Sequence, residues 1–125
     1  MDLQAYPHNV QTLARQAREL LRDWLPDAKE TEDESPRMFA YGYGPGYRGM
    51  ICTLIPSKAG VKLGIVCGAS LPDPHGLLRG AGKIHRHLLL KTVDDLVQPG
   101  IKKLVLAAGA ACTERLREAG VLSGN

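Results

Sequence analysis

The sequence lacks paired cysteines, long apolar runs and an N-terminal targeting pattern, and each absence excludes a class of protein. Cys52, Cys67 and Cys112 stand far apart, without the C-x-x-C spacing that zinc sites and dithiol redox centres use. No apolar run approaches the ~18 residues of a membrane span. The N-terminus has no basic region followed by an apolar one. We therefore expect a cytoplasmic protein, without a membrane partner, whose thiols are reduced and buried.

Net charge and aromatic content are also low. The formal net charge is +3, and aromatic residues make up 5% of the chain. Binding of nucleic acid normally requires clustered lysine and arginine, so we do not expect a nucleic-acid partner. The chain has 125 residues, 44% of them hydrophobic, which suffices for one core without disulfides or a structural metal. The expected organisation is a single domain over residues 1–125.

Two long helices are predicted towards the ends of the chain. Apolar residues recur at helical spacing over residues 10–25, with Asn9 as the expected N-cap and Pro26 as the stop. Pro99 suits the first position of a second long helix, and Gly120 suits its end. Both helices have one apolar face, so both should pack against a common core.

The middle of the chain is divided by glycine-rich and proline-rich turns. We predict strands at Met38–Tyr43, Tyr47–Ile55, Val61–Cys67 and Ile84–Lys91, followed by a short helix that starts at Thr92. The turn GYGPGYRG lacks the pattern of a phosphate-binding loop, so we expect a hairpin turn there. This order of elements predicts an α+β fold of two layers, an antiparallel sheet covered on one face by the N-terminal and C-terminal helices.

Glycines and basic residues are most concentrated in residues 71–91, LPDPHGLLRGAGKIHRHLLLK. Its prolines and glycines predict a loop with one helical turn around Leu77 and Leu78, before the last strand begins. From Arg79 to Lys91 the stretch has no acidic residue. Its basic residues and histidines there are Arg79, Lys83, His85, Arg86, His87 and Lys91. This composition predicts an electropositive loop and strand.

Five residues of this stretch, which we call the basic motif, suit ligand binding: Gly80, Gly82, Lys83, Arg86 and His87. Lys83 and Arg86 offer charge-assisted donors, the glycines let backbone N–H groups converge, and His87 adds an imidazole. The motif predicts recognition of an anionic ligand or a protein partner. The structural alternative is that the glycines shape the loop, Arg86 pairs with an acid, and His87 is a hydrogen-bonded strand residue.

A second candidate site is the acidic segment DAKETEDES, residues 27–35. Clustered carboxylates suit hard cations such as calcium, magnesium, manganese or ferrous iron. The candidate ligands are Glu30, Glu32, Asp33 and Glu34. The alternative is a solvated loop or a charged edge strand, since charge on an edge discourages pairing with other strands.

Histidines and cysteines offer weaker possibilities. A transition-metal site with His85 and His87 on one strand face would need a third ligand, such as Cys67 or His75. Cys67 should point inward at the end of its strand, where His87 is the histidine that alternation could bring near it as a catalytic base. No serine stands in an elbow motif. We therefore expect no enzymatic activity and no cofactor, with iron as the alternative.

Two longer segments, GYRGMICTLIPSKAGVKLGI and GASLPDPHGLLRGAGKIHRHLLLKTVDDL, together resemble the YdhG-like family of bacterial domains of unknown function. The resemblance covers the chain from about Val10 to about Ala111. Its most specific part is LPDP-x-GLL-x-G-x-GK-x-x-RH, in which the family's basic motif maps onto Lys83, Arg86 and His87. The resemblance implies a compact α+β fold, frataxin-like in layout, and for some similar proteins a role as an intracellular iron chaperone. It brings no catalytic residues.

Three hypotheses of different class follow from these observations. The first is a small binding or adaptor domain that uses the basic motif. The second is an iron-delivery protein that uses the acidic segment. The third is a small hydrolase or transferase, which would require a pocket lined by the basic motif together with a carboxylate of shifted pKa.

Overall fold

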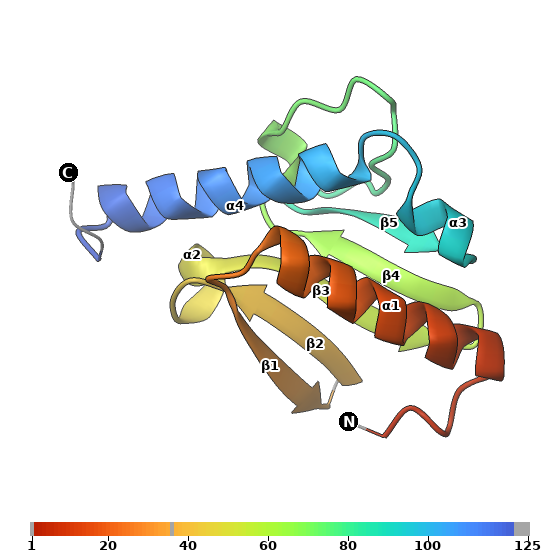
Figure 1. Ribbon diagram of the computed structural model, residues 1–125. Helices are drawn as coiled ribbons and strands as arrows, with labels where there is room; N and C mark the ends of the chain where they lie inside the picture. The colour runs from red at the N-terminus through yellow and green to blue at the C-terminus, as the bar shows by residue number, and fades with distance from the viewer. Residues whose placement is uncertain (1, 36, 122–125) are drawn as a thin grey trace.

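The computed structural model describes residues 2–35 and 37–121. Figure 1 shows an antiparallel sheet with two long helices on the same side of it. In chain order the elements are α1 (His8–Trp24), β1 (Lys29–Glu34), β2 (Arg37–Gly42), α2 (Gly46–Gly49), β3 (Met50–Ser57), β4 (Gly60–Ile65), the 3₁₀ turn η1 (Gly68–Ser70), β5 (Arg86–Leu90), α3 (Val93–Leu96) and α4 (Ile101–Glu118).

The five strands pair in the order β1-β2-β3-β4-β5, each antiparallel to the next along the chain. Side chains on a strand alternate between the two faces of a sheet. On one face Phe39, Leu54, Leu63 and Leu88 stand opposite one another in register across four strands. All four are buried, and each buried side chain of this size contributes about 1.5–3 kcal/mol. This face of the sheet is therefore the floor of the core.

The helices α1 and α4 form the roof of the core. Both contact β3, and α1 also contacts β4. The buried residues of α1 are Val10, Leu13, Ala14, Ala17 and Leu21. The buried residues of α4 are Ile101, Leu104, Val105, Ala108, Gly109, Cys112 and Leu116. The predicted α+β fold, an antiparallel sheet covered on one face by the terminal helices, is confirmed. Among the described residues, no helix has the length and apolar character needed to cross a membrane.

Two of the predicted helix starts are wrong. Asn9 is not an N-cap, because α1 already begins at His8, where the carbonyl of Pro7 accepts hydrogen bonds from the N–H groups of Val10 and Gln11. Pro99 lies outside α4, because Gly100 is in the left-handed region (φ 99°) and interrupts the helical backbone.

Two other helix-end predictions are confirmed. Thr92 caps α3, with Asp95 completing a capping box in which each residue bonds to the backbone of the other. Gly120, at φ 76°, ends α4 as expected.

The connection between β2 and β3 differs from the prediction. Tyr47 does not begin a strand, because residues 46–49 form the helical turn α2 and β3 starts at Met50. The carbonyl oxygen of Gly49 accepts the N–H groups of Tyr43 (2.8 Å) and Gly44 (3.4 Å), which draws the two ends of the connection together. A Cβ atom at Gly49 would overlap the backbone of Gly44. Glycine is therefore needed at this position for close backbone approach.

The stretch before β5 also differs from the prediction. Residues around Leu77 and Leu78 form no helical turn; their N–H groups instead donate to the carboxylate of Asp73. Cys67 is only half-buried, because β4 ends at Ile65 and Cys67 adopts a left-handed conformation (φ 58°) that leads into η1. Cys67 therefore does not belong to a strand, and the expectation that its thiol is buried is wrong.

Replacing Gly49 by alanine should lower the free energy of unfolding by about 3 kcal/mol, because the added methyl group meets backbone atoms that cannot move aside. Gly46→Ala is the matched control: a Cβ atom there meets nothing within 4 Å, so the cost is only that of the left-handed backbone (φ 69°), about 1 kcal/mol. Urea unfolding followed by circular dichroism measures both. Equal losses in the two variants would contradict the close approach at Gly49.

Candidate functional site

The sheet face opposite the helices has small side chains along its central row from β1 to β4, and a histidine on β5. In register from β1 to β5 this row is Thr31, Ala40, Thr53, Gly64 and His87. Small side chains lower the surface relative to the longer side chains around them. Two hollows lie on this face, and both are lined by residues of the row.

The smaller hollow has a volume of about 310 Å³ and extends from β2 to the start of β5. We call it the Arg86 hollow. Its lining residues are Met38, Gly46, Tyr47, Met50, Thr53, Gly64, Ile65, Val66, His85 and Arg86. Most of these residues are apolar or small, and the polar side chains gather where β5 begins. An apolar concavity with a few convergent polar groups is the usual form of a small-molecule site.

His85 is held in a defined orientation at the edge of this hollow. Its Nδ1 atom accepts the backbone N–H of Cys67 at 3.0 Å. Because Nδ1 acts as an acceptor, the proton of the neutral imidazole is on Nε2, which is left as a donor. The ring also stacks on Tyr47, with 5.7 Å between centroids. The left-handed turn at Cys67 therefore has a role, since it presents the N–H that fixes His85.

Arg86 follows His85 in the chain but leaves β5 on the helix side, because its register partner is Ile65, and its side chain lies beside Gly68, Gly80 and Gly82. Its Nη1 donates to the carbonyl oxygen of His85 at 3.2 Å. Within residues 2–35 and 37–121 it forms no ion pair, so the expected pairing of Arg86 with an acid is wrong. A guanidinium carries five N–H donors, so several remain for a ligand.

The charge of the surrounding sequence reinforces this site. Between Glu34 and Asp94 the chain has one acidic residue, Asp73, whose carboxylate already accepts two backbone N–H groups. The same stretch has eight basic residues: Arg37, Arg48, Lys58, Lys62, Arg79, Lys83, Arg86 and Lys91. The strands β2 to β5 and their connections therefore form the positive part of the molecule, which favours an anion over a cation.

The other members of the basic motif do not line the Arg86 hollow. Lys83 is exposed in the loop before β5. His87 exchanges two backbone hydrogen bonds with Arg79, at 2.7 and 3.0 Å, and its ring packs beside Gly80. Gly82 lies beside the carbonyl of His85. The structure thus divides the motif: Arg86 carries a charge without an acidic partner among the described residues, whereas the glycines and His87 shape the loop beside it.

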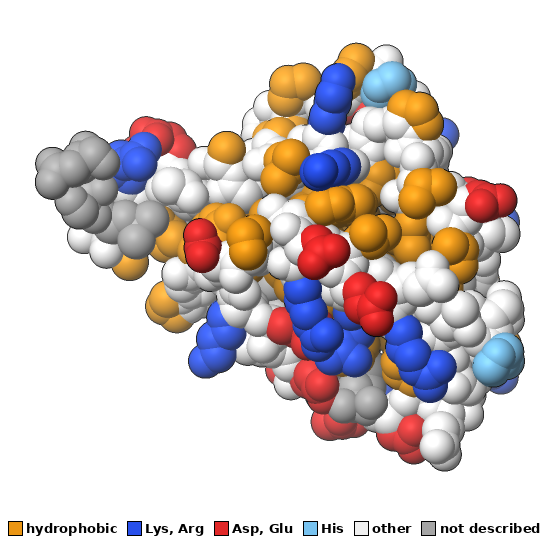
Figure 2. All heavy atoms as spheres, viewed as in Figure 1, with side chains coloured by type: hydrophobic (Ala, Val, Ile, Leu, Met, Phe, Trp, Pro, Cys, Tyr) orange, Lys and Arg blue, Asp and Glu red, His pale blue; other side chains and the backbone are white. Residues whose placement is uncertain are grey.

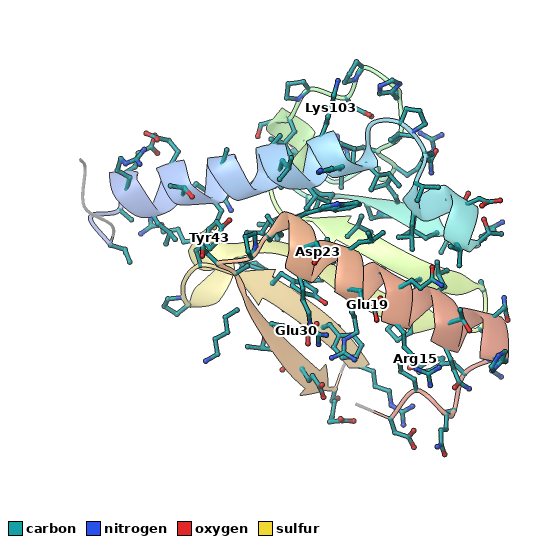
Figure 3. The ribbon with its side chains drawn as sticks, in the orientation of Figure 1. Arg15, Glu19, Asp23, Glu30, Tyr43 and Lys103 are labelled. Atoms are coloured by element: carbon teal, nitrogen blue, oxygen red, sulfur yellow. The ribbon has the colours of Figure 1, made fainter. Side chains whose placement is uncertain are left out.

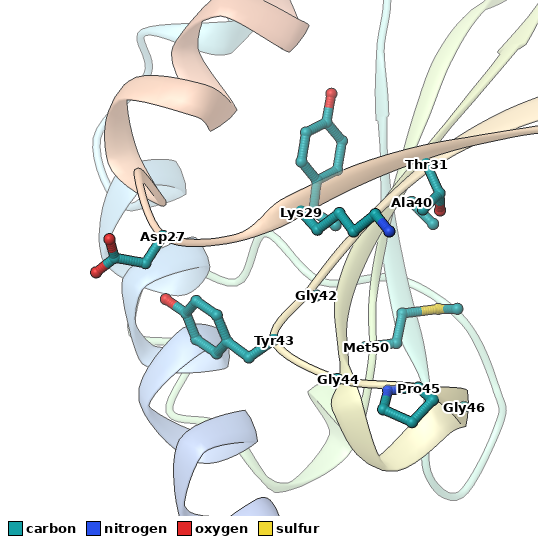
Figure 4. Close-up of a pocket in the computed structure, with 11 residues that line it drawn as sticks. Asp27, Lys29, Thr31, Ala40, Gly42, Tyr43, Gly44, Pro45, Gly46 and Met50 are labelled. Carbon is teal, nitrogen blue, oxygen red and sulfur yellow. The ribbon is translucent and has the colours of Figure 1, made fainter.

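The larger hollow, of about 510 Å³, lies over β1 and β2 and beside the glycine-rich connection. Figure 4 shows Lys29 extended over the strands towards Thr31, with Tyr43 and Asp27 at the opposite end. It shares Gly46 and Met50 with the Arg86 hollow, so the two are neighbours. Its lining carries one acid and one base, and so has no net preference for an anion.

The acidic segment forms the edge strand β1, as one of the two interpretations predicted. Glu30 points under α1 (Figure 3), where its carboxylate accepts hydrogen bonds from Arg18 (2.8 and 3.2 Å), Arg22 (2.7 Å) and the Tyr41 hydroxyl. Arg18 also lies over the Phe39 ring at 4.1 Å. Acidic and basic side chains intermingle over α1 and the nearby strands in Figure 2. The network joins the edge strand to the helix.

This network controls the ionisation of Glu30. Partial burial by itself would raise the pKa of the carboxyl, but the hydrogen bonds from Arg18, Tyr41 and Arg22 lower it to about 2. Burial and the bond to Glu30 raise the pKa of the Tyr41 hydroxyl, which therefore stays protonated as a donor. Glu30 is thus an ionised, fully occupied acceptor rather than an open metal ligand.

The predicted metal ligands are not brought together. Strand alternation places Glu30, Glu32 and Glu34 on the helix side and Asp33 on the other. Among the described residues no three His, Cys, Asp or Glu side chains lie close enough to share a metal ion. This applies equally to His85 and His87 with Cys67 or His75, and His75 packs against Gly100 instead. Iron binding remains a prediction, and the described residues provide no preformed site that supports it.

The sequence predicts that the Cys67 thiol lies near His87. The structure instead shows a hydrogen bond from the backbone N–H of Cys67 to Nδ1 of His85. Burial raises the pKa of the Cys52 thiol to about 12 and also raises that of Cys112, so both thiols stay protonated near neutral pH.

Sequence reasoning missed Tyr47, Met38 and Met50 as site residues. They line the hollows because the helices leave one face of the sheet uncovered and because residues 46–49 form α2. No local sequence pattern predicted α2.

Comparison of the chain with protein-family models, with curated proteins and with solved structures gave no significant match. The candidate site therefore rests on its geometry.

The Glu30 network predicts a pH dependence of stability. Because the pKa of Glu30 is lowered in the folded state to about 2 from an ordinary 4.5, its contribution is complete above pH 4.5 and is lost as the pH falls towards 2. Glu30→Gln should lower the free energy of unfolding by about 2 kcal/mol at pH 7, and by progressively less below pH 4.5. Urea unfolding at several pH values measures this. Glu34→Gln, at an exposed position of the same strand, is the control; equal losses in the two variants would contradict the network.

Proposed function

We propose that this chain is a small, non-enzymatic cytoplasmic domain that binds an anionic group, of a small ligand or of a protein partner, through the basic motif, with Arg86 as the main contact. The observation that carries the proposal is the position of Arg86: its guanidinium has no acidic partner among the described residues, and its side chain lies beside Gly80 and Gly82 of the same motif. An uncompensated cation attracts anions and offers them charge-assisted hydrogen bonds.

Three further observations support the proposal. His85, next to Arg86 in the chain, presents an Nε2–H donor, because its Nδ1 is occupied by Cys67. The strands β2 to β5 and their connections carry a large excess of basic residues over acidic ones. The three cysteines are free thiols, as is usual in a reducing compartment such as the cytoplasm.

The resemblance to the YdhG-like family is compatible with this proposal, since the most specific part of that resemblance contains Arg86. The resemblance also suggests iron delivery. Glu30, the most enclosed carboxylate of the acidic segment, is already bonded to two arginines and a tyrosine. We therefore place the binding of an anion first.

The test is a titration of the ¹⁵N-labelled chain with acetate and with inorganic phosphate, followed by amide chemical shifts. The shifts should be largest around Arg86 and His85. Arg86→Gln should weaken binding at least about ten-fold, since a hydrogen bond to a charged group contributes about 1.5–3 kcal/mol.

Lys62→Gln is the matched control. Lys62 is an exposed cation on the neighbouring strand, on the same sheet face as Gly64, and it lines neither hollow. Its loss should change the affinity less than two-fold. Equal weakening in both variants would show that only diffuse charge is involved, and absence of binding of both anions would overturn the proposal.

A further inference from the structure

The lining of the Arg86 hollow offers no charged side chain to a ligand, although Arg86 is one of its residues. The side chain of Arg86 leaves β5 on the helix side and lies beside Gly80 and Gly82, so its backbone is the part that reaches the open face. His85 accepts a hydrogen bond at Nδ1, and its imidazole is therefore neutral in this arrangement. A charged ligand would lose hydration here without gaining an ionic partner. The hollow consequently favours an uncharged ligand.

The floor of the hollow is bare of large side chains and offers one hydroxyl group. Thr53 and Gly64 are cross-strand partners on the open face, and a Cβ atom at Gly64 would lie 2.5 Å from Oγ1 of Thr53. The hydroxyl of Thr53 is therefore directed over Gly64, where the glycine leaves room for it. Among the described residues this hydroxyl has no hydrogen-bond partner. It is free to bond to a polar group of a ligand.

An aromatic wall stands beside this floor. Tyr47 of α2 is 73% exposed and stacks on His85, with 5.7 Å between the ring centroids. His85 is itself fixed by the backbone N–H of Cys67, at 3.0 Å from Nδ1. A ring that is already held in place loses little conformational freedom when a ligand binds. The wall is therefore preorganised for contact with another aromatic ring.

Two methionines flank the floor. Ala40 stands opposite Thr53 and Gly42 opposite Met50, so Met38 and Met50 lie on either side of the row that contains Thr53. Both methionines line the hollow, and both are half-buried. Methionine side chains are flexible, and their sulfur atoms make favourable contacts with aromatic rings. The sides of the hollow thus suit the same kind of ligand as its wall.

We propose that the Arg86 hollow binds an uncharged aromatic ring that carries a hydrogen-bonding group, with the ring against Tyr47 and the polar group on the hydroxyl of Thr53. A volume of about 310 Å³ is at the lower end of the range for ligand pockets, so the ligand is a small ring system rather than a large cofactor. This site is separate from the proposed anion site, because the side chain of Arg86 lies on the opposite side of the sheet.

The experiment is a chemical-shift titration of the ¹⁵N-labelled full chain with benzamide and with cyclohexanecarboxamide, which carry the same amide on an aromatic and on a saturated ring. Benzamide should shift the amide signals of Tyr47, Thr53 and Gly64. It should bind roughly two- to twelve-fold more tightly than cyclohexanecarboxamide, because an aromatic contact adds to the effect of buried area.

Variants at Tyr47 and Thr53 test the two contacts separately. Tyr47→Leu should abolish the preference for benzamide over cyclohexanecarboxamide, whereas Tyr47→Phe, the matched control, should keep it. Thr53→Val removes the hydroxyl at nearly constant volume and should weaken both amides roughly two- to twelve-fold, as the loss of one hydrogen bond gives. The ratio of two affinities in one variant does not depend on the stability of that variant, and circular dichroism confirms that each variant is folded.

Arg86→Gln distinguishes this site from the anion site. The variant should change the affinity for benzamide less than two-fold, although it should weaken the binding of acetate and phosphate. Benzoate is titrated into the same variant, so that the anion site does not contribute, and it should bind more weakly than benzamide because its charge has no partner in the hollow.

Several outcomes would overturn the inference and leave the anion site standing. These are the absence of saturable benzamide binding, equal affinity for the two amides in the parent, loss of benzamide binding in Arg86→Gln, and tighter binding of benzoate than of benzamide in that variant. A preference for benzamide that Tyr47→Leu abolishes and Tyr47→Phe keeps supports the inference.

Discussion

The structure depends on the burial of one face of a five-stranded sheet beneath two helices. Every strand pairs with its neighbour in sequence, so no crossover connection passes over the opposite face. Both α1 and α4 pack on the same face of the sheet (Figure 1). Along each strand, the apolar residues of this face therefore alternate with residues of the uncovered face. On that other side the side chains of the central row are small from Thr31 to Gly64, and these residues line the two hollows.

The short connection between β2 and β3 contributes residues to both hollows on this open face. The glycine contacts at Gly44 and Gly49 close the connection tightly, and α4 holds it through Arg115, whose guanidinium donates to the carbonyl of Met50 at 2.9 Å. This position brings Tyr47 to the start of β5, where it stacks on His85. The same element that anchors the sheet to the helices therefore also lines both hollows.

Sequence periodicity sufficed for the layers of the fold, because the apolar stripes of residues 10–25 and of α4, and the alternation in β4, are local patterns that packing then satisfied. It failed where backbone contacts between distant residues decide the conformation, at Gly49 and at Cys67. For the site, the charge of the stretch before β5 singled out Arg86, but the role of each motif residue depends on tertiary position. A carboxylate cluster in β1 looked like a metal site because sequence spacing does not show that Arg18 and Arg22 lie across from Glu30.

The separation of charge along the chain explains why the two candidate sites behave differently. Glu30 and Glu32 of β1 pair with arginines of α1, and this pairing joins the edge strand to the helix. Basic residues of β2 to β5 have almost no acids in their own part of the chain, and the fold gives Arg86 no acidic partner among the described residues. Ion pairing inside the molecule thus occupies Glu30 and leaves the guanidinium of Arg86 without an acidic partner among the described residues. The same electrostatic imbalance that stabilises one end of the sheet is the reason why we propose that an external anion binds at the other end.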